Sequence, residues 1–586
     1  RLAQGGLIDR SQALSFRFDG RRIAAHPGDT VASALLAAGV RLVGRSFKHH
    51  RPRGVLSAGV EEPNALVGVG RGARHEPNAR ATVREVQDGL RVVSQNRWPS
   101  LSFDAGQAAD LAKPLLGAGF YYKTFMWPAA FWERVYEPLI RNAAGLGRLS
   151  GRADPDPAEK RTRECDLLVI GAGPSGLMAA REAARAGLRV VLAEEDFRVG
   201  GRLLAEGEPV GGRSGPDWAE GVRAELESLG VRVMTRTAVF GAYDHGLYGA
   251  LERRPDGGVC LWRIHARTSV LAAGAIERPV GFEGNDRPGV MLAGAVRAYL
   301  NRWAVRPGAQ AVVLCADDAA WRTAEALAAA GAEVLIADAR SADALPAAPA
   351  GATVSAGTVV CATRGRLGLS GVRLRSARGE RWVSADLLAV SGGWSPSVHL
   401  SCHHRGRPVW DAAVGGFVPG AELPPGMTVA GAADGVMTTR GALVSGGEAG
   451  RAAAEALGAS VGAFEAPEAE DRPRRFGTLL LVEGAGKGAY VDLQNDVTVA
   501  DVGQAEQEGF RSVEHLKRYT TLGMATDQGK TGNVLGLAAL AQASGVSIAE
   551  AGTTIYRPPW TPVPISAFGG DHKGEAYRPA REAPSH

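Results

Sequence analysis

Residues 166–194 decide the fold of this chain: Asp166-Leu-Leu-Val-Ile170, then Gly171-Ala-Gly-Pro-Ser-Gly176, then a run that ends at Glu194. The opening apolar run is typical of a buried parallel strand. In the turn after it, the first glycine allows a tight turn, the second lets the backbone approach a pyrophosphate, and the third lets the next helix pack on the strand. Glu194 lies 18 residues after Gly176, where a ribose hydroxyl would be bound. The stretch predicts a strand–helix–strand unit with cofactor contacts at Gly171, Gly173, Pro174, Ser175, Gly176 and Glu194.

The segments that follow are expected to complete this nucleotide site. The loop Gly200-Gly-Arg202 can close over the pyrophosphate, where Arg202 can pair with a phosphate. Because Glu194 and Glu195 would repel a 2′-phosphate, the site favours NAD or an adenine flavin over NADP. From the adenine end towards the far half of the cofactor, the expected contacts are Val239, Gly274, Asp434, Met437 and Thr439.

A second strand–helix–strand pattern lies at residues 309–340, but it lacks the glycines. Its strands are predicted at Ala311–Leu314 and Glu333–Ala337, on either side of a helix at Ala319–Ala330. Asp317 and Asp318 stand where phosphates need backbone amides, and their charge would repel a pyrophosphate. We interpret this unit as a Rossmann-like scaffold without a nucleotide.

The whole sequence predicts an α/β fold, with a core of two dinucleotide-binding-type (Rossmann-like) domains between two smaller domains. Residues 15–100 alternate short apolar runs with turns and predict a small α+β domain, whose helix begins at Val31 after the capping residues Asp29 and Thr30. Aromatic residues dominate 105–150, a pattern more typical of a core or a subunit interface than of a cofactor site. The predicted domains are 1–104, a helical linker at 105–163, the nucleotide-binding domain at 164–300 plus 400–466, the second unit at 301–399, and a small helical domain with a tail at 467–586.

Composition argues against several classes of function. The 586 residues have a net charge of +5 and one short basic run, Lys48 to Arg53, so no nucleic-acid partner is expected. No apolar run is long enough to predict a membrane span. Five scattered cysteines without a Cys-x-x-Cys pair indicate a reduced, cytoplasmic protein. We find no catalytic acid, base or nucleophile and no metal-ligand pattern, which fits a subunit that binds cofactors while a partner does the chemistry.

Several stretches carry a resemblance to a known family. They are Arg1–Gly5, Gly44–Lys48, Arg51–Gly54, Glu62–Asn64, Gly274–Pro279, Gly284–Gly289, Ser391–Trp394, Arg518–Met524 and Asp527–Lys530. On these, the chain resembles the alpha subunit of heterotetrameric sarcosine oxidase over its full length. In that family the alpha subunit normally continues into a folate-binding, aminomethyltransferase-like domain. This sequence ends at Pro584-Ser-His586, about where that domain would begin, so we expect the domain either to be cut off here or to lie on another chain.

The resemblance implies an oxidoreductase acting on CH–NH groups. It would demethylate sarcosine with O2 as final acceptor, giving glycine, H2O2 and either formaldehyde or methylene-tetrahydrofolate. It implies NAD in this chain, FAD in a partner beta subunit, FMN at the interface between the two, and two smaller subunits. The NAD ligands carried over are Ser175, Glu194, Glu195, Arg202, Val239, Ala432, Met437 and Thr439.

Cysteines are missing where related amine and opine dehydrogenases hold iron–sulfur clusters. The small C-terminal domain resembles a cluster-bearing domain, whose cysteines would fall at Asp492, Gln494, Asp527 and Gly532, and the N-terminal domain resembles a ferredoxin-type fold although residues 1–150 contain no cysteine. We expect both domains to be free of clusters, which favours the oxidase branch.

The C-terminal domain also has polar residues suited to a flavin phosphate or ring carbonyl. They are Lys517, Arg518, Thr520, Thr521, Gln528 and Lys530, hypothesised to line the alpha side of an FMN site. The alternative interpretation is a solvated or subunit-facing polar turn. For the whole chain, the alternatives are a subunit of a related amino acid, opine or proline dehydrogenase with a structural nucleotide such as ATP or ADP, and a stand-alone FAD-dependent NAD(P)H oxidoreductase.

Overall fold

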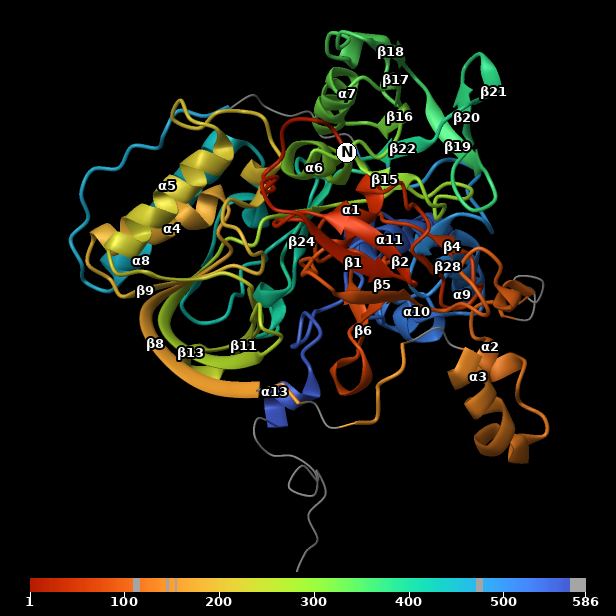
Figure 1. Ribbon diagram of the computed structural model, residues 1–586, viewed down its shortest axis with the longest axis horizontal. Helices are drawn as coiled ribbons and strands as arrows, with labels where there is room; N and C mark the ends of the chain where they lie inside the picture. The colour runs from red at the N-terminus through yellow and green to blue at the C-terminus, as the bar shows by residue number, and fades with distance from the viewer. Residues whose placement is uncertain (109–115, 144–146, 153–154, 157, 471–477, 570–586) are drawn as a thin grey trace, which may run out of the picture.

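The computed structural model describes residues 1–108, 116–143, 147–152, 155–156, 158–470 and 478–569. It consists of two units built on largely parallel sheets and two smaller domains. In Figure 1 the nucleotide-binding unit lies on the left, the second unit at the top, and the N-terminal domain in the centre, in front of the C-terminal helices. None of the helices in the described ranges combines the length and apolar character needed to cross a membrane.

The nucleotide-binding unit contains a seven-stranded sheet in the order β10-β9-β8-β13-β12-β11, with β26 paired to β13. Strands β8, β9, β10, β13 and β26 are parallel, so their carboxyl ends meet at one edge. The strands are β8 (Ala158–Ile170), β9 (Val190–Ala193), β10 (Arg232–Met234), β11 (Thr237–Tyr243), β12 (Leu247–Arg253), β13 (Val259–Leu271) and β26 (Met427–Val429).

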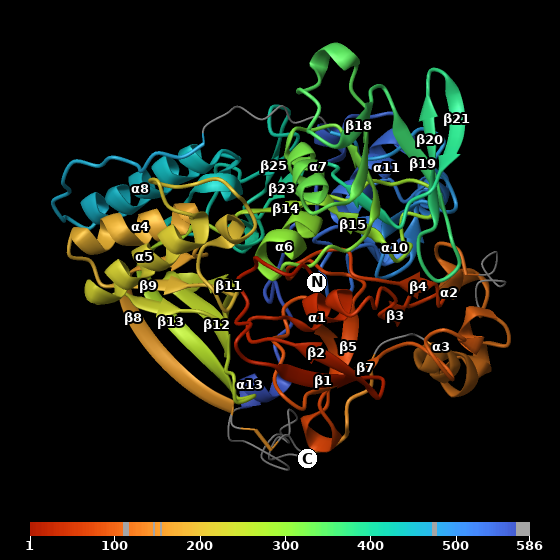
Figure 2. The ribbon, with the colours of Figure 1, turned by 45° about the horizontal axis from the view of Figure 1, so that its top comes forward.

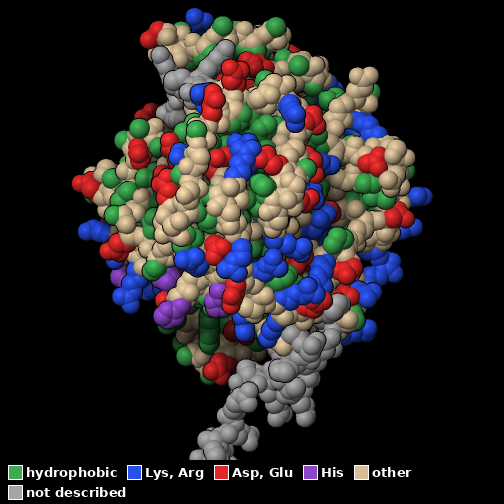
Figure 3. Space-filling model, turned by 90° about the vertical axis from the view of Figure 1, so that its left-hand side faces the viewer, with side chains coloured by type: hydrophobic (Ala, Val, Ile, Leu, Met, Phe, Trp, Pro, Cys, Tyr) green, Lys and Arg blue, Asp and Glu red, His purple; other side chains and the backbone are tan. Residues whose placement is uncertain are grey.

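Three helices cover this sheet: α4 (Pro174–Arg185), α5 (Gly215–Ser228) and α8 (Thr439–Ala456). They form a layer over the sheet in Figure 2. Helix α4 begins at Pro174, a residue whose fixed φ suits the first turn, and its small buried residues allow α8 to pack closely on it. Side chains of both charges are spread over this side of the molecule (Figure 3).

The second unit is built on a parallel sheet in the order β15-β22-β16-β17-β18. The predicted strand–helix–strand pattern is confirmed to within one residue, as β16 (Gln310–Cys315), α7 (Ala319–Ala329) and β17 (Glu333–Asp338). The remaining elements are β15 (Val290–Leu292), α6 (Ala293–Trp303), β18 (Ala352–Ser355), β22 (Leu387–Val390), and an antiparallel sheet of β19 (Val359–Arg364), β20 (Gly371–Ser376) and β21 (Gly379–Val383). Short antiparallel pairs, β14 (Ala275–Glu277) with β23 (Trp394–Pro396) and β24 (Val409–Asp411) with β25 (Gly416–Val418), lie where the chain passes between the two units.

The N-terminal domain is a five-stranded sheet with one helix, as the α+β prediction expects. Helix α1 (Val31–Ala37) begins after Thr30, whose hydroxyl accepts a hydrogen bond from the Ser33 amide at 3.2 Å, while Ser33 bonds back to the Thr30 amide. The sheet order is β2-β1-β7-β5-β6, and the domain's strands are β1 (Leu14–Phe18), β2 (Arg21–Ala25), β3 (Gly44–Arg45), β4 (Pro52–Arg53), β5 (Leu66–Val69), β6 (Glu76–Arg80) and β7 (Arg91–Ser94).

An aromatic arm, residues 116–143, follows this domain and projects away from the body in Figure 1. It contains α2 (Phe120–Lys123) and α3 (Glu137–Ala143). Trp127 is 84% exposed and Tyr122 69%. Such exposure is unlike a core, and it is consistent with the predicted subunit interface.

The C-terminal domain is mostly helical. It contains β27 (Tyr490–Asp492), β28 (Val497–Thr498), α9 (Val499–Gln507), α10 (Val513–Thr520), α11 (Asn533–Ser544), α12 (Ile548–Ala551) and α13 (Ile565–Gly569). The end of the predicted tail, residues 570–586, lies outside the described residues.

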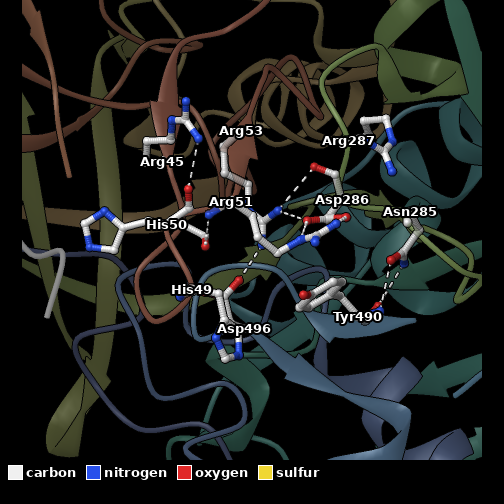
Figure 4. Close-up of polar contacts among 12 residues, drawn as sticks. Arg45, His49, His50, Arg51, Arg53, Asn285, Asp286, Arg287, Tyr490 and Asp496 are labelled. Carbon is white, nitrogen blue, oxygen red and sulfur yellow. Dashed lines mark hydrogen bonds and ion pairs between the residues drawn. The ribbon is translucent and has the colours of Figure 1, made fainter. Parts of the chain in front are cut away.

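A buried ionic network joins three of these domains (Figure 4). Arg53 of β4 pairs with Asp286 of the second unit and with Asp496 of the C-terminal domain, and all three side chains are buried. Arg51 also pairs with Asp286, at 2.6 Å, and both guanidinium groups lie over the ring of Tyr490. The motifs 51–54 and 284–289 therefore meet in space.

Candidate cofactor site

The turn between β8 and α4 has the geometry that its glycines predict. Gly171 has φ +100°, and a Cβ there would lie 2.5 Å from the carbonyl oxygen of Ala272. A Cβ at Gly176 would lie 1.8 Å from the carbonyl oxygen of Gly171. A Cβ at Gly173, by contrast, would meet nothing within 4 Å. This open space faces the first turn of a helix, whose amides have no intrahelical acceptors, so a pyrophosphate fits there.

Glu194 follows β9 and braces the glycine turn. One carboxylate oxygen accepts a hydrogen bond from the Ala172 amide at 2.6 Å, and the other accepts one from the Asp196 amide at 2.9 Å. Burial, reinforced by the charge of Asp196, raises the pKa of Glu194 to about 8. Each oxygen has a further lone pair, so the carboxylate can still accept ribose hydroxyls.

A cavity of about 640 Å³ lies beside Glu194, between the nucleotide-binding unit and the N-terminal domain. Glu195 and Arg202 line it on one side, and Glu61 and Arg80 line it on the other. Desolvation raises the pKa of Glu195 to about 7, with Lys530 opposing the shift and Glu61 adding to it. Two acids from different domains thus face the cavity, whose lining includes Glu194 but no residue of the turn 171–176.

Ion pairs hold the N-terminal domain against the cavity. Arg236 donates to both carboxylate oxygens of Glu85, at 2.6 and 2.7 Å, and Arg253 pairs with Glu76 at 2.9 Å. The C-terminal segment 561–564 lines the cavity as well. Segments far apart in sequence therefore build one chamber.

Arg202 and Val239, predicted to lie near the phosphates and the adenine, are fixed by contacts with neighbouring side chains and by burial. The guanidinium of Arg202 pairs with Glu206 at 2.5 Å and lies 4.0 Å from the centre of the Trp394 ring. Val239 is buried in β11, and its neighbour Ala238 lines the cavity.

The residues predicted for the far half of the cofactor follow β13 and β26, at the same sheet edge as the glycine turn. Gly274 has φ +71°, Ala432 and Asp434 belong to the short helix η9 (Gly431–Asp434), Met437 is half-buried, and Thr439 begins α8. Burial raises the pKa of Asp434.

Ser175 packs towards η9, and a Cβ at Gly431 would lie 2.9 Å from its Oγ. That buried Oγ has no hydrogen-bond partner within the described part of the chain. A bound phosphate would supply an acceptor for the hydroxyl.

The second unit fills its own nucleotide position with an ionic network. Arg340 pairs with Asp318 at 2.7 Å and with Asp338 at 2.8 Å, which bridges the start of α7 to the end of β17. Asp317 is fully buried and accepts hydrogen bonds from Ser391 Oγ and the Ala320 amide. These contacts occupy the polar groups that a pyrophosphate would need, which supports the interpretation of this unit as one without a nucleotide.

The polar residues proposed for FMN lie in different surroundings. Arg518 is exposed at the surface, whereas Lys530 is buried, with its Nζ 3.0 Å from the carbonyl oxygen of Trp560 and 3.6 Å from the centre of its ring. Burial, and then the charge of Arg80, lower the pKa of Lys530 to about 7.

Three other members of this group bond locally. Thr520 Oγ1 donates to the carbonyl oxygen of Leu516 in its own helix, Thr521 ends that helix with φ +66°, and the Gln528 side chain donates to the carbonyl oxygen of Ala525.

The four positions where cluster cysteines would fall in the C-terminal domain do come together. The Asp527 amide donates to Gln494 Oε1 at 3.0 Å, and a side chain at Gly532 would begin 3.6 Å from the Cβ of Asp492. The Asp492 carboxylate accepts from the amides of Gln494 and Gly523, at 2.9 and 2.8 Å. Over the described ranges, no three His, Cys, Asp or Glu side chains are grouped to hold a metal ion.

Sequence reasoning missed the cavity residues outside the nucleotide-binding unit, above all Glu61, Arg80 and the segment 561–564. No local pattern marks them, because they reach the cavity only through packing between domains.

Known proteins resemble this chain at several levels. The alpha subunit of sarcosine oxidase from Rhizobium meliloti (strain 1021) is 48% identical over all of this chain, and that from Corynebacterium sp. (strain P-1) is 40% identical over 99% of it. Over its whole length the chain is similar to these sarcosine oxidase alpha subunits. It spans 60% and 58% of the length of these two relatives.

Three segments of this chain also match models of known domain families. Residues 486–572 match the sarcosine oxidase A3 domain, residues 11–97 a 2Fe-2S iron-sulfur cluster binding domain, and residues 166–229 the FAD-dependent oxidoreductases. The crystal structure of L-proline dehydrogenase from P. horikoshii has the same fold, with a TM-score of 0.68 and 19% identity, over 95% of this chain and 98% of its own. The predicted core with its two flanking domains is thereby confirmed.

Proposed function

We propose that this chain is the NAD-holding alpha subunit of a heteromeric, flavin-dependent sarcosine oxidase. The NAD assignment rests on the position of Glu194. Its carboxylate accepts a hydrogen bond from the Ala172 amide of the glycine turn, and it lines a cavity of about 640 Å³. Glu195 and Glu61 face the same space, and their charge disfavours a 2′-phosphate. NAD supplies a nicotinamide ring that can accept a hydride, and Gly173, Ser175 and Glu194 are the residues that would hold its phosphates and ribose.

The NAD assignment is tested by competition. The protein, stripped of nucleotide by mild denaturation and refolded, should bind NAD at least tenfold more tightly than NADP, measured by calorimetry. Glu195→Gln should narrow this difference, because it removes a charge that repels the 2′-phosphate, whereas Glu220→Gln, an exposed acid of α5, should not. Equal affinity for the two nucleotides in the native chain would contradict the assignment.

Oxidation of the amine itself is proposed to occur on a partner. We assign FAD to a beta subunit, FMN to the interface between the two chains, and two smaller subunits to a cytoplasmic heterotetramer. O2 would be the acceptor, and glycine, H2O2 and formaldehyde or methylene-tetrahydrofolate the products. The named relatives are subunits, the aromatic arm exposes Trp127 and Tyr122, and five buried cysteines without a disulfide suit a reducing compartment.

The partner assignment is tested by expression with and without a flavin-bearing beta chain. Sarcosine-dependent O2 uptake should require both chains, and each should co-purify with the other. Sarcosine oxidation by this chain alone, or NAD(P)H oxidation on its own bound FAD, would favour the stand-alone oxidoreductase instead.

The FMN group is tested at Lys530. In the assembled complex, Lys530→Ala should lower FMN content and slow electron transfer between the flavins, whereas Lys487→Ala, at an exposed lysine of the same domain, should change neither. Unchanged FMN content and transfer rate in the Lys530 variant would remove this lysine from the proposed site.

A further inference from the structure

The loop between β4 and β5 wraps its backbone around the carboxylate of Glu62. This side chain is fully buried. Its Oε2 accepts hydrogen bonds from the amides of Leu56 and Ser57, at 3.0 and 2.7 Å, and its Oε1 accepts from the amides of Asn64 and Ala65, at 2.8 and 2.9 Å. The Ser57 hydroxyl adds a fifth donor at 3.2 Å. Converging amides of this kind form a concave site for an anion.

The spacing of the loop matches that of an iron–sulfur ligand loop. Ser57, Glu62 and Ala65 are separated by four and then two residues, the plant-type ferredoxin spacing of the first three cysteines. They lie within residues 11–97, which match the 2Fe-2S domain. Thr82 closes the loop from the far side, since its hydroxyl donates to the Gly59 carbonyl oxygen at 2.6 Å. The side chains at all four positions are at most 2% exposed.

None of these four residues is cysteine, so the cluster that the domain family implies does not fit. A cluster is an anion whose sulfurs accept hydrogen bonds from the surrounding amides. A carboxylate offers the same charge sign and the same acceptors in a smaller volume. We propose that the Glu62 carboxylate replaces the 2Fe–2S cluster in this loop, as an internal anion that holds the loop closed without metal.

A second loop of the chain follows the same design. The resemblance implies four converging cysteine positions in the C-terminal domain, and Asp492 is one of them. Its buried carboxylate accepts hydrogen bonds from the backbone amides of Gln494, Asn495 and Gly523. An independent segment thus has a buried carboxylate at one of the positions where the resemblance implies cluster cysteines.

The replacement matters for the cofactor site because the Glu62 loop is one of its walls. Ala58, Gly59, Val60 and Glu61 all line the cavity beside Glu194. Glu62 therefore sets the shape of the wall that presents Glu61 to the cavity.

The first test asks whether the loop is an anion site. In the full chain, Glu62→Ala should lower the thermal midpoint by several degrees, and formate should recover part of that loss, whereas neutral formamide at the same concentration and ionic strength should not. Glu61→Ala is the matched control, because its carboxylate faces the cavity, and formate should not raise its midpoint. No recovery by formate in the folded Glu62→Ala protein would overturn the proposal.

Glu62→Gln covers the case in which the alanine variant does not fold. The amide keeps the volume but turns an NH2 group towards backbone donors, so its midpoint should fall and formate should not restore it. A glutamine variant as stable as the native chain would also overturn the proposal.

The second test restores the ligands. The variant Ser57→Cys/Glu62→Cys/Ala65→Cys/Thr82→Cys, incubated anaerobically with ferrous iron and sulfide, should take up about two iron atoms per chain and show the visible absorption and, once reduced, the EPR signal of a 2Fe–2S cluster. Serine at the same four positions should take up none. A folded four-cysteine variant without a cluster would contradict the assignment of these positions.

Discussion

Among single residues, Glu194 has two roles: its carboxylate binds the glycine turn, and it is the proposed acceptor for the ribose hydroxyls of the nucleotide. Its carboxylate fixes the Ala172 amide, and burial raises its pKa to about 8. Ribose hydroxyls would donate to the ionised form and stabilise it, so binding lowers the pKa and releases a proton.

The nucleotide affinity should therefore rise with pH, by up to about tenfold per unit below pH 8, and level off above that value. Glu194→Gln should weaken binding above pH 8 and remove most of this slope, because the amide does not titrate. Calorimetric titration between pH 6 and pH 9 checks both effects. An affinity that falls with pH, or a glutamine variant with the native slope, would show that Glu194 does not bind the ribose.

At the scale of elements, two strand–helix–strand units have the same pattern and different chemistry. Residues 166–194 and 309–340 could both be placed from sequence, because strand hydrophobicity and the helix after the turn are local properties. That the second unit holds no nucleotide, inferred from the missing glycines at 317–318, stays a prediction. The bridge by which Arg340 ties Asp318 to Asp338 could not be predicted, because it depends on the distance between α7 and the end of β17.

We therefore expect substitutions in the first unit, and not those in the second, to change nucleotide binding. Gly173→Asp places a carboxylate at the open end of α4 and should lower nucleotide content at least tenfold, through repulsion of the pyrophosphate. Asp318→Asn is the matched change in the second unit and should leave one nucleotide per chain. Two nucleotides per chain, or a loss in the Asp318 variant, would show that the second unit binds one.

At the scale of the whole molecule, domains far apart in sequence are joined by buried charge. Arg53 pairs with Asp286 and Asp496 across three domains (Figure 4). The same packing brings Glu61 and the segment 561–564 to the cofactor cavity. Sequence could identify the motifs around Arg53 as distinctive, but not that they meet, since contacts between domains leave no periodic pattern.

Removing this arginine should weaken the assembly of the domains. Arg53→Leu leaves two buried carboxylates without their partner and should lower the free energy of unfolding by about 3–5 kcal/mol. Arg74→Leu breaks an ion pair with Asp156 at a mostly exposed arginine and should cost less than about 1 kcal/mol. Urea denaturation followed by tryptophan fluorescence compares the two, and equal losses would contradict a central role for the buried network.

We propose that the cavity beside Glu194 holds NAD in a subunit that depends on a flavin-bearing partner. The most direct measurement is to purify the assembled protein, separate this chain from its partners, release its nucleotide by denaturation and identify it by mass. We expect one NAD per chain and no FAD released from this subunit. FAD, or an adenine nucleotide without nicotinamide, would contradict the proposal.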